Sequence, residues 1–563
     1  MRSKTIVALT ILVLVMIVVW RLRRPELQSS VKFHHSRVRA HELYSLYMSP
    51  LSCNGTSLDL SCELTTKGGG MQKWVSSNTR QFRHRLVHID LKGAPPKMSY
   101  LLQLLSHFKQ LGASGLLVEY EDMYPYEGEL KVLQRKEAYK KEEVLEFIQR
   151  ASALGLDIVP LVPTFGHLEF VLKQSKFKSI RALPDDLSAL SATNKDSLDV
   201  VKKLIEDVMR LHPRSKWIHL GGDEVDSLRR SKSDVQSKLG KDDLYLRHMK
   251  PVLEFVRERF NGIRSIIWHD MLVDWSVSSL SELASLAEPM LWEYRPHADM
   301  FMVDEMLRRF SSAFPRIWAA SAFKGASGQL TDFVPITERI QNHVSWMRIL
   351  QKFPGPGQLV GIALTGWSRY DHFATFCELL PAGIPSLGIC LKTLEFGYLS
   401  NFAHKDISEQ LGMDYLVPLD AADALQFQDN AVKSGSAFPG SEIYYLSIRL
   451  LRAQKQMNHG VNIDQGWSSL WNVQHKFVST GKLQRGKTVL NSVLKTYDGI
   501  EEGVVKILKK YFDDTTAKEF QASKVTASKE KISFIISNVD KKIAEWKKIK
   551  LYVWTFRTQR SPH

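Results

Sequence analysis

The chain has 563 residues, of which 44% are hydrophobic and 10% aromatic, and its formal net charge is +16. This length and composition provide a large core and argue against both a single small domain and a largely disordered chain. The basic residues are spread along the chain and form no motif in which they interleave with aromatics, so we attribute the charge mostly to solvated surface and expect no nucleic-acid partner.

The first predicted element is an apolar segment over residues 5–20, which carries no charge and precedes three arginines and a proline. At about 1.5 Å per residue this run spans about 24 Å, and no small-residue cleavage site follows it. We therefore expect an uncleaved signal-anchor over residues 5–22 behind a cytosolic tail of residues 1–4. The flanking positive charges nearly balance and leave the orientation open. We expect a type II single-pass protein of the endoplasmic reticulum or Golgi, with the large domain in the lumen, rather than a secreted protein.

A stem without sustained periodicity is predicted over residues 23–82. It contains a glycosylation sequon at Asn54, placed between Cys53 and Cys62. In a lumen Asn54 would carry a glycan and the two cysteines could close a small disulfide loop, although a lone sequon also arises by chance.

From about residue 84 to 400 the chain alternates short β-rich runs with amphipathic helices, which is typical of repeated βα units. Eight strands in this segment and their connecting helices match a closed (β/α)8 TIM barrel, in the α/β class. A doubly wound sheet is the alternative, but no glycine-rich dinucleotide fingerprint follows the first strand. Residues 401–563 have helical periodicity and are predicted to form a helical region packed on the barrel. The predicted strands cover residues 86–91, 115–120, 157–162, 217–220, 265–268, 289–292, 316–320 and 360–365.

In such a barrel the active site lies at the carboxyl ends of the strands. Carboxylates or histidines follow every predicted strand except the seventh, usually beside aromatic residues. Each of them alone could be a helix cap or a rim residue, but together they predict a polar pocket with aromatic walls, which suits a sugar. Phosphate chemistry would need glycine-rich loops or metal ligands, and no Cys/His cluster has metal-ligand spacing. We expect a glycosidase without metal or cofactor, and we expect Cys377 and Cys390 to be buried thiols.

The stretch Trp217–Glu224 is the most informative part of the chain. An apolar run ends in two glycines, and the adjacent carboxylates Asp223 and Glu224 follow. Taken alone, the two acids would serve equally well at the N-terminus of a helix. At the end of the fourth of eight barrel strands, however, paired acids are suited to act as a proton donor and a charge stabiliser.

The segment His219–Glu224 (HLGGDE) resembles the signature of glycoside hydrolase family 20, the β-N-acetylhexosaminidases. The resemblance covers about residues 84 to 390, is weak beyond about 440 and is absent before 80. The hexosaminidase D-like branch of that family lacks a membrane anchor, so the resemblance implies no compartment. Five further blocks are similar to that branch: VHIDLKGAPP (87–96), VEYEDMYPYEG (118–128), TFGHLEFVL (164–172), WAASAFKG (318–325) and TGWSRYDH (365–372).

The resemblance implies substrate-assisted hydrolysis, in which the acetamido oxygen of the substrate is the nucleophile. Glu224 would protonate the leaving oxygen, with a pKa raised by burial beside aromatics and by the Asp223 charge. Asp223 would hold the acetamido N–H and balance the charge of the oxazolinium ring. The resemblance also implies a pocket floor of Trp367, walls of Trp268 and Trp292, a hydrogen bond from Tyr294 to the acetamido carbonyl, His167 near the sugar hydroxyls or the acid, and His219 orienting Asp223.

Two departures from the family leave the preference between GalNAc and GlcNAc open. Most members have an arginine after the first strand, whereas this chain has Asp90 and Lys92, and Lys92 would act on sugar hydroxyls as a point charge. The end of the second strand is acidic and aromatic instead of containing histidine.

The predicted function is removal of terminal β-linked GalNAc or GlcNAc from glycoconjugates by an exo-acting, retaining enzyme. A catalytically silent glycan-binding protein on the same barrel is the alternative, which the presence of the acid disfavours. A membrane-tethered interaction protein that uses the basic helical tail would leave the pocket residues without a function. The expected partners are a glycan with a terminal N-acetylhexosamine and the membrane, with a homodimer as one candidate assembly.

Overall fold

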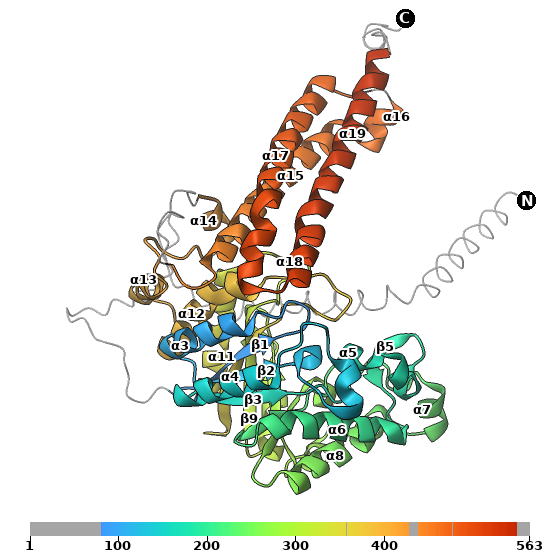
Figure 1. Cartoon of the computed structure of the whole chain (residues 1–563), viewed down its shortest axis with the longest axis vertical. Helices are drawn as coiled ribbons and strands as arrows, with labels where there is room; N and C mark the ends of the chain where they lie inside the picture. The colour runs from blue at the N-terminus through green and yellow to red at the C-terminus, as the bar shows by residue number, and fades with distance from the viewer. Residues whose placement is uncertain (1–79, 356, 427–436, 476, 549–563) are drawn as a thin grey trace, which may run out of the picture. The chain divides into compact units, whose positions relative to one another are not determined.

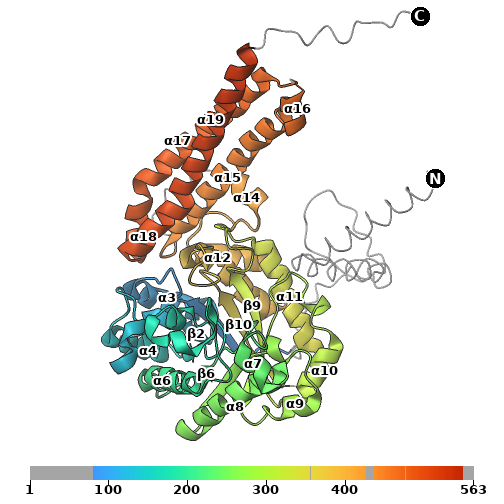
Figure 2. The ribbon, with the colours of Figure 1, turned by 90° about the vertical axis from the view of Figure 1, so that its right-hand side faces the viewer.

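The computed structural model describes residues 80–355, 357–426, 437–475 and 477–548 (Figures 1 and 2). The predicted tail, signal-anchor and almost all of the stem, with Cys53, Asn54 and Cys62, lie outside these residues. Within the described ranges, no helix has the length and apolar character needed to cross a membrane.

Eight parallel strands close into a barrel in the order β1-β10-β9-β8-β7-β6-β3-β2, which confirms the predicted barrel. The first strand pairs with the last, with Val87 opposite Leu364, and this pairing closes the sheet. Every predicted strand is present, with ends shifted by a few residues. The strands are β1 (His84–Asp90), β2 (Gly115–Glu119), β3 (Asp157–Leu161), β6 (Trp217–His219), β7 (Arg264–Trp268), β8 (Ala287–Trp292), β9 (Ile317–Lys324) and β10 (Leu359–Gly366).

The barrel interior is filled by side chains that alternate along the strands. Leu86, Leu117, Val159, Trp217 and Trp318 belong to this inner cluster and are almost completely buried. Outward-facing strand residues such as Val87 and Val118 pack instead on the surrounding helices, so both faces of the sheet are covered and the strands are predominantly apolar. The helices that follow the strands are α3 (Met98–Gln110), α4 (Lys141–Ala153), α6 (Lys195–Leu211), α8 (Lys241–Arg259), α9 (Val277–Ser281), α10 (Asp304–Ala313), α11 (Ile336–Lys352) and α12 (Leu380–Phe396).

The connection between β3 and α6 is longer than the other strand-to-helix connections and contains a hairpin that the sequence did not predict. After α5 (Glu169–Leu172), strands β4 (Arg181–Leu183) and β5 (Asp186–Leu190) pair antiparallel. The strands are short and joined by a Pro-Asp turn, so neither shows a period-2 pattern.

The C-terminal region is helical, as predicted. Its three long helices lie side by side in both views (Figures 1 and 2) and share a second core that contains Leu490, Val493 and Val504. The helices are α13 (Asn401–Gln410), α14 (Ala421–Gln426), α15 (Ser441–Trp467), α16 (Leu470–Gln474), α17 (Thr480–Tyr511), α18 (Asp514–Phe520) and α19 (Ala527–Lys548), with a π-helical turn at Gln521–Thr526 before α19.

The helical region contacts loops that follow the carboxyl ends of the barrel strands. The amide of Lys97, after β1, donates to the Tyr511 carbonyl at 2.7 Å. Asp332, after β9, forms a 2.7 Å ion pair with Lys524 in the π-helical turn. Arg369, after β10, pairs with Glu519. The helical region therefore supports the loops on the side of the barrel where the active site is expected.

Candidate active site

A cavity of about 600 Å³ opens at the carboxyl ends of the strands. Its lining contains seven carboxylates, two permanently cationic side chains and four aromatic side chains predicted from the sequence. The chain as a whole is basic, so the acidic character belongs to this cavity and favours a neutral or cationic species within it. The carboxylates are Glu119, Glu169, Asp186, Asp223, Glu224, Asp226 and Asp371, the cations Lys92 and Arg230, and the aromatics Trp268, Trp292, Tyr294 and Trp367.

The turn after β6 brings Asp223 and Glu224 to the cavity. Gly221 and Gly222 have φ angles of 61° and 85°, which side chains other than glycine rarely adopt. The chain thus reverses sharply between the buried strand and the acids. Glu224 itself has φ 47°, an uncommon and strained value for a residue with a side chain.

His167 connects the two acids. Its Nε2 lies 3.3 Å from Oδ2 of Asp223 and 3.2 Å from Oε2 of Glu224. Burial lowers the pKa of His167, but the Asp223 charge and the hydrogen bonds to both carboxylates outweigh burial and raise this pKa well above its ordinary value. His167 therefore lies beside the acid, as the family resemblance implied, and carries a positive charge between two negative ones.

The pKa of Glu224 shifts in the direction opposite to the one predicted. The hydrogen bond from His167 lowers the pKa of Glu224, and this effect exceeds the opposing effect of burial. The side chain of Glu224 is 56% exposed to the open cavity, so burial beside aromatics does not raise its pKa as expected. Glu224 is thus a carboxylate paired with the His167 cation.

Asp270 holds the backbone of the acid. Its Oδ2 accepts the Glu224 amide hydrogen at 2.9 Å and its Oδ1 accepts the Trp292 indole N–H at 3.1 Å. Burial and the nearby Asp223 charge raise the pKa of Asp270 to about 7. Asp270 follows the fifth predicted strand, but it was not among the predicted site residues.

The aromatic residues form the cavity wall. Trp292 and Tyr294 stack with their ring centroids 5.3 Å apart and an interplanar angle of 23°. Trp268, which is almost completely buried, lies deeper, and the Trp367 ring packs edge-on against His88 at 4.6 Å. Flat apolar faces beside carboxylates are the combination that a sugar ring requires.

The backbone that carries Trp367 is held from the seventh strand, where no carboxylate or histidine was found in the sequence. The buried Lys324 ammonium donates to the Trp367 carbonyl at 2.7 Å and to the Glu378 carbonyl at 2.9 Å. Gly325 follows with φ 73°, and a Cβ atom there would overlap the Trp367 carbonyl oxygen. The seventh strand thus positions the backbone of Trp367 at the pocket, although it contributes no acid to the lining.

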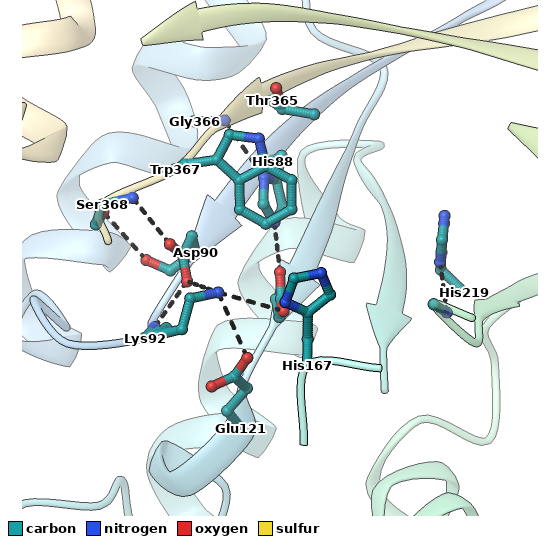
Figure 3. Close-up of polar contacts among 12 residues, drawn as sticks. His88, Asp90, Lys92, Glu121, His167, His219, Thr365, Gly366, Trp367 and Ser368 are labelled. Carbon is teal, nitrogen blue, oxygen red and sulfur yellow. Dashed lines mark hydrogen bonds and ion pairs between the residues drawn. The ribbon is translucent and has the colours of Figure 1, made fainter. Parts of the chain in front are cut away.

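Lys92 lies at the cavity surface among carboxylates (Figure 3). Its Nζ is 3.5 Å from Glu121 and 3.8 Å from both Asp90 and Glu119. Burial lowers the pKa of Lys92, but these carboxylates raise it well above its ordinary value overall. The Lys92 charge is therefore already balanced by the protein, and it lies 5.2 Å from the centre of the Trp367 ring.

Two predicted substrate-binding residues lie outside the cavity lining. Asp90 is 3% exposed, and its two oxygens accept the Lys92 and Ser368 amides at 2.8 Å each, so it joins the loops after β1 and β10. His219, which was expected to orient Asp223, makes no direct hydrogen bond to it among the described residues; its Nδ1 accepts the Gly221 amide at 3.0 Å, in the turn that leads to Asp223 (Figure 3). His219 is fully buried, and burial lowers its pKa to about 3, so it supports the glycine turn as a neutral ring.

The sequence-based prediction missed several residues of the site, among them Glu119, Glu169 and Asp270. Glu119 lies near the end of a predicted strand, and Glu169 and Asp270 follow predicted strands, so their position could have identified them. Glu119 accepts a hydrogen bond from His88 Nε2 at 3.1 Å, since His88 Nδ1 accepts the Gly366 amide. Glu169 is 4% exposed, and its Oε2 has no hydrogen-bond partner among the described residues.

Neither a disulfide nor a metal site is found in the part of the chain that the structure describes. Cys377 and Cys390 are buried free thiols, as predicted. Within the same residues, no three His, Cys, Asp or Glu side chains are arranged to hold a metal ion.

Comparison with known proteins identifies relatives of this chain. A family model described as the catalytic domain of glycosyl hydrolase family 20 matches residues 108–301. The chain is 35% identical over 476 residues to hexosaminidase D of Homo sapiens, covering 82% of this chain and 96% of the relative. It is 41% identical over 339 residues to hexosaminidase D of Bos taurus, covering 59% and 98%.

Solved structures similar to this chain include two bacterial proteins. The β-N-acetylhexosaminidase of Bacteroides fragilis is 17% identical with a TM-score of 0.45, over 59% of this chain and 70% of that one. A mutant β-hexosaminidase of Streptomyces plicatus in complex with its product GlcNAc is 14% identical with a TM-score of 0.45, over 61% and 71%.

Proposed function

The chain belongs to glycosyl hydrolase family 20, in its hexosaminidase D-like branch, and from this premise we propose that it is an exo-acting, retaining enzyme for terminal β-linked GalNAc or GlcNAc. The reaction class, that of a β-N-acetylhexosaminidase, follows from the family and from the hexosaminidase D relatives. The finer proposal rests on one observation, the pair Asp223 and Glu224 joined by His167 at the mouth of an aromatic cavity.

Glu224 is the proposed proton donor to the glycosidic oxygen. Its side chain is 56% exposed, so a sugar bound in the cavity would shield it from solvent, and desolvation favours the protonated form. The proton is within reach, because His167 Nε2 lies 3.2 Å from Glu224 Oε2. After the leaving group departs, Glu224 accepts a proton from the attacking water.

Asp223 is the proposed partner of the acetamido group. The acetamido oxygen attacks the anomeric carbon, and the resulting oxazolinium ring is positively charged. The Asp223 carboxylate accepts the acetamido N–H and stabilises that charge. Six further carboxylates line the cavity and act in the same direction, since developing positive charge is favoured in an acidic environment.

An exo mode of action is supported by the lower part of the cavity. The Trp268 and Lys92 side chains there are each 2% exposed, so a glycan would enter with its terminal sugar. Trp292, Tyr294 and Trp367 provide ring faces for this sugar, and Glu169 Oε2, which has no partner within the described part of the chain, provides a hydrogen-bond acceptor.

Hydrolysis of aryl β-GlcNAc and aryl β-GalNAc by the purified protein tests the proposal. We expect turnover of at least one substrate, and a loss of at least about 10²-fold in kcat for Glu224→Gln and for Asp223→Asn. Full activity in Glu224→Gln, or no turnover of either substrate by the unchanged protein, would exclude it. The ratio of kcat/KM for the two substrates gives the sugar preference.

We also propose that the catalytic unit faces the lumen of the early secretory pathway, held by a signal-anchor over residues 5–22. The support is the sequence: an apolar run without a cleavage site, and a sequon at Asn54 between two cysteines. A glycan on Asn54, detected as a mobility shift that an endoglycosidase and Asn54→Gln both abolish, is the expected result. An unglycosylated protein would contradict a luminal location.

A homodimer is a further prediction, to be tested by light scattering.

A further inference from the structure

Asp270 lies at the start of the 3-10 turn η5 (Asp270–Leu272), directly after β7 and His269, and 46 residues from Glu224 along the chain. Both of its carboxylate oxygens accept hydrogen bonds from other loops of the site. One bond comes from the Glu224 amide at 2.9 Å and the other from the Trp292 indole at 3.1 Å. A single carboxylate therefore connects the backbone of the proton donor with the aromatic wall.

The first hydrogen bond acts where the backbone is strained. Glu224 has φ 47°, a strained conformation for a non-glycine residue, which persists only when its surroundings fix it. The acceptor of the Glu224 amide hydrogen is Asp270, so this bond opposes relaxation of the turn. Relaxation of the backbone would change the direction of the Cα–Cβ bond of Glu224. The carboxyl group would then move away from the position of the glycosidic oxygen that it is proposed to protonate.

The second hydrogen bond fixes the wall that the sugar contacts. The Trp292 ring stacks on Tyr294, and both rings line the cavity. Because the same carboxylate holds Trp292 and Glu224, the distance between the wall and the acid is set by the Asp270 side chain. Asp270 itself does not line the cavity, which separates it from the groups that touch the sugar.

We propose that Asp270 is a positioning residue, which holds the proton donor Glu224 at a fixed position relative to the sugar-binding wall at Trp292. This inference rests on the proposed function of Glu224. A misplacement of about 1 Å can cost about 10²-fold in rate, so an indirect contact of this kind is sufficient to control proton transfer.

Asparagine is the informative substitution at this position. Asp270→Asn keeps the shape of the side chain, but its amide offers one acceptor oxygen and turns an NH₂ group towards the second donor. It therefore cannot accept from both the Glu224 amide and the Trp292 indole. Asp270→Glu keeps two acceptor oxygens and displaces them, so it should retain more activity.

The test compares two substrates that differ in their need for an acid. A phenyl glycoside of the preferred N-acetylhexosamine needs protonation of its leaving group, whereas a 2,4-dinitrophenyl glycoside does not. For Asp270→Asn in the full chain we expect kcat to fall by at least about 10-fold on the phenyl glycoside and by less than about 3-fold on the dinitrophenyl glycoside. Glu224→Gln should show the same pattern more strongly, and Asp270→Glu should lie between Asp270→Asn and the unchanged protein.

Asp274→Asn is the matched control, because Asp274 is an exposed carboxylate four residues further along and outside the cavity lining. It should leave both rates unchanged. Equal losses on the two substrates for Asp270→Asn, or no loss, would overturn the inference. If Asp270→Asn does not fold, equal losses in Asp270→Glu have the same meaning. An unchanged protein that hydrolyses neither substrate would instead overturn the proposed function.

Discussion

At the scale of single residues, the positive charge of His167 is the main electrostatic feature of the site. One imidazole contacts both acids, so it lowers the pKa of Glu224 while its own pKa rises. Residue types and strand-end position pointed to Asp223 and Glu224, and the family resemblance added His167. The direction of the Glu224 shift could not be predicted, because it depends on a 3.2 Å contact between residues from different loops.

Replacing His167 with glutamine should change the pH dependence of catalysis. Glutamine removes the cation that stabilises the Glu224 carboxylate, so the pKa of Glu224 should rise. The alkaline limb of kcat/KM, which reports loss of the proton from the acid, should therefore move to higher pH. A pH–rate profile of the two forms measures this, and a limb that stays in place or moves to lower pH would show that His167 does not set the charge of the acid.

The same contact should also make stability depend on pH. Folding raises the pKa of His167, so its contribution is complete below the unfolded value of about 6.5 and is lost as the pH rises through the folded value. Folding lowers the pKa of Glu224, so its contribution is present above the unfolded value of about 4.3 and is lost as the pH falls through the folded value. His167→Gln should lower Tm more at about pH 5.5 than at high pH, and an equal change at both would contradict this.

At the scale of elements, the strands were predictable and the loops were only partly so. The eight barrel strands are buried on both faces and appear in the sequence as short apolar runs, and all eight were predicted. The hairpin of β4 and β5 was missed, yet Asp186 from it lines the cavity. Its strands are held by two register pairs and by backbone hydrogen bonds to the loop after β3, from Leu168 to Ser188 and from Leu190 to Phe165, and neither interaction produces a periodic sequence pattern.

The turn after β9 provides an element-scale prediction. Gly325→Ala places a methyl group against the Trp367 carbonyl and strains a residue at φ 73°. We expect a lower Tm and an increase of about 10-fold or more in KM, because displacement of Trp367 weakens sugar binding. Gly112→Ala is the matched control, since its φ is also positive but nothing lies near the added methyl group. If the two variants have the same KM, the turn does not position Trp367.

At the scale of the whole molecule, the helical region and the barrel are joined by ion pairs that the sequence does not reveal. Lys524, in the π-helical turn, is largely buried and contacts Asp332 at 2.7 Å. The helical periodicity of the tail was visible in the sequence, but its contacts with the loops after β1, β9 and β10 join residues far apart in the chain. No local pattern reports such contacts.

Breaking this pair should destabilise the protein. Asp332→Asn leaves the Lys524 charge buried without its counter-ion, which should cost about 3 kcal/mol in the free energy of unfolding. Lys518→Ala, in the exposed pair with Asp514, should cost less than about 1 kcal/mol. Urea unfolding of both variants measures the difference, and equal small losses would show that the helical region is held by other contacts.

In the proposed reaction the acetamido group of the substrate is the nucleophile, assisted by Asp223 and Glu224. The most direct measurement is the rate on aryl glycosides whose N-acyl group carries none, one, two or three fluorine atoms. Fluorine withdraws electrons from the acyl oxygen and weakens it as a nucleophile, so kcat should fall steadily along the series. Rates that are independent of fluorine content would contradict the account and would indicate that a protein carboxylate or a water molecule attacks instead.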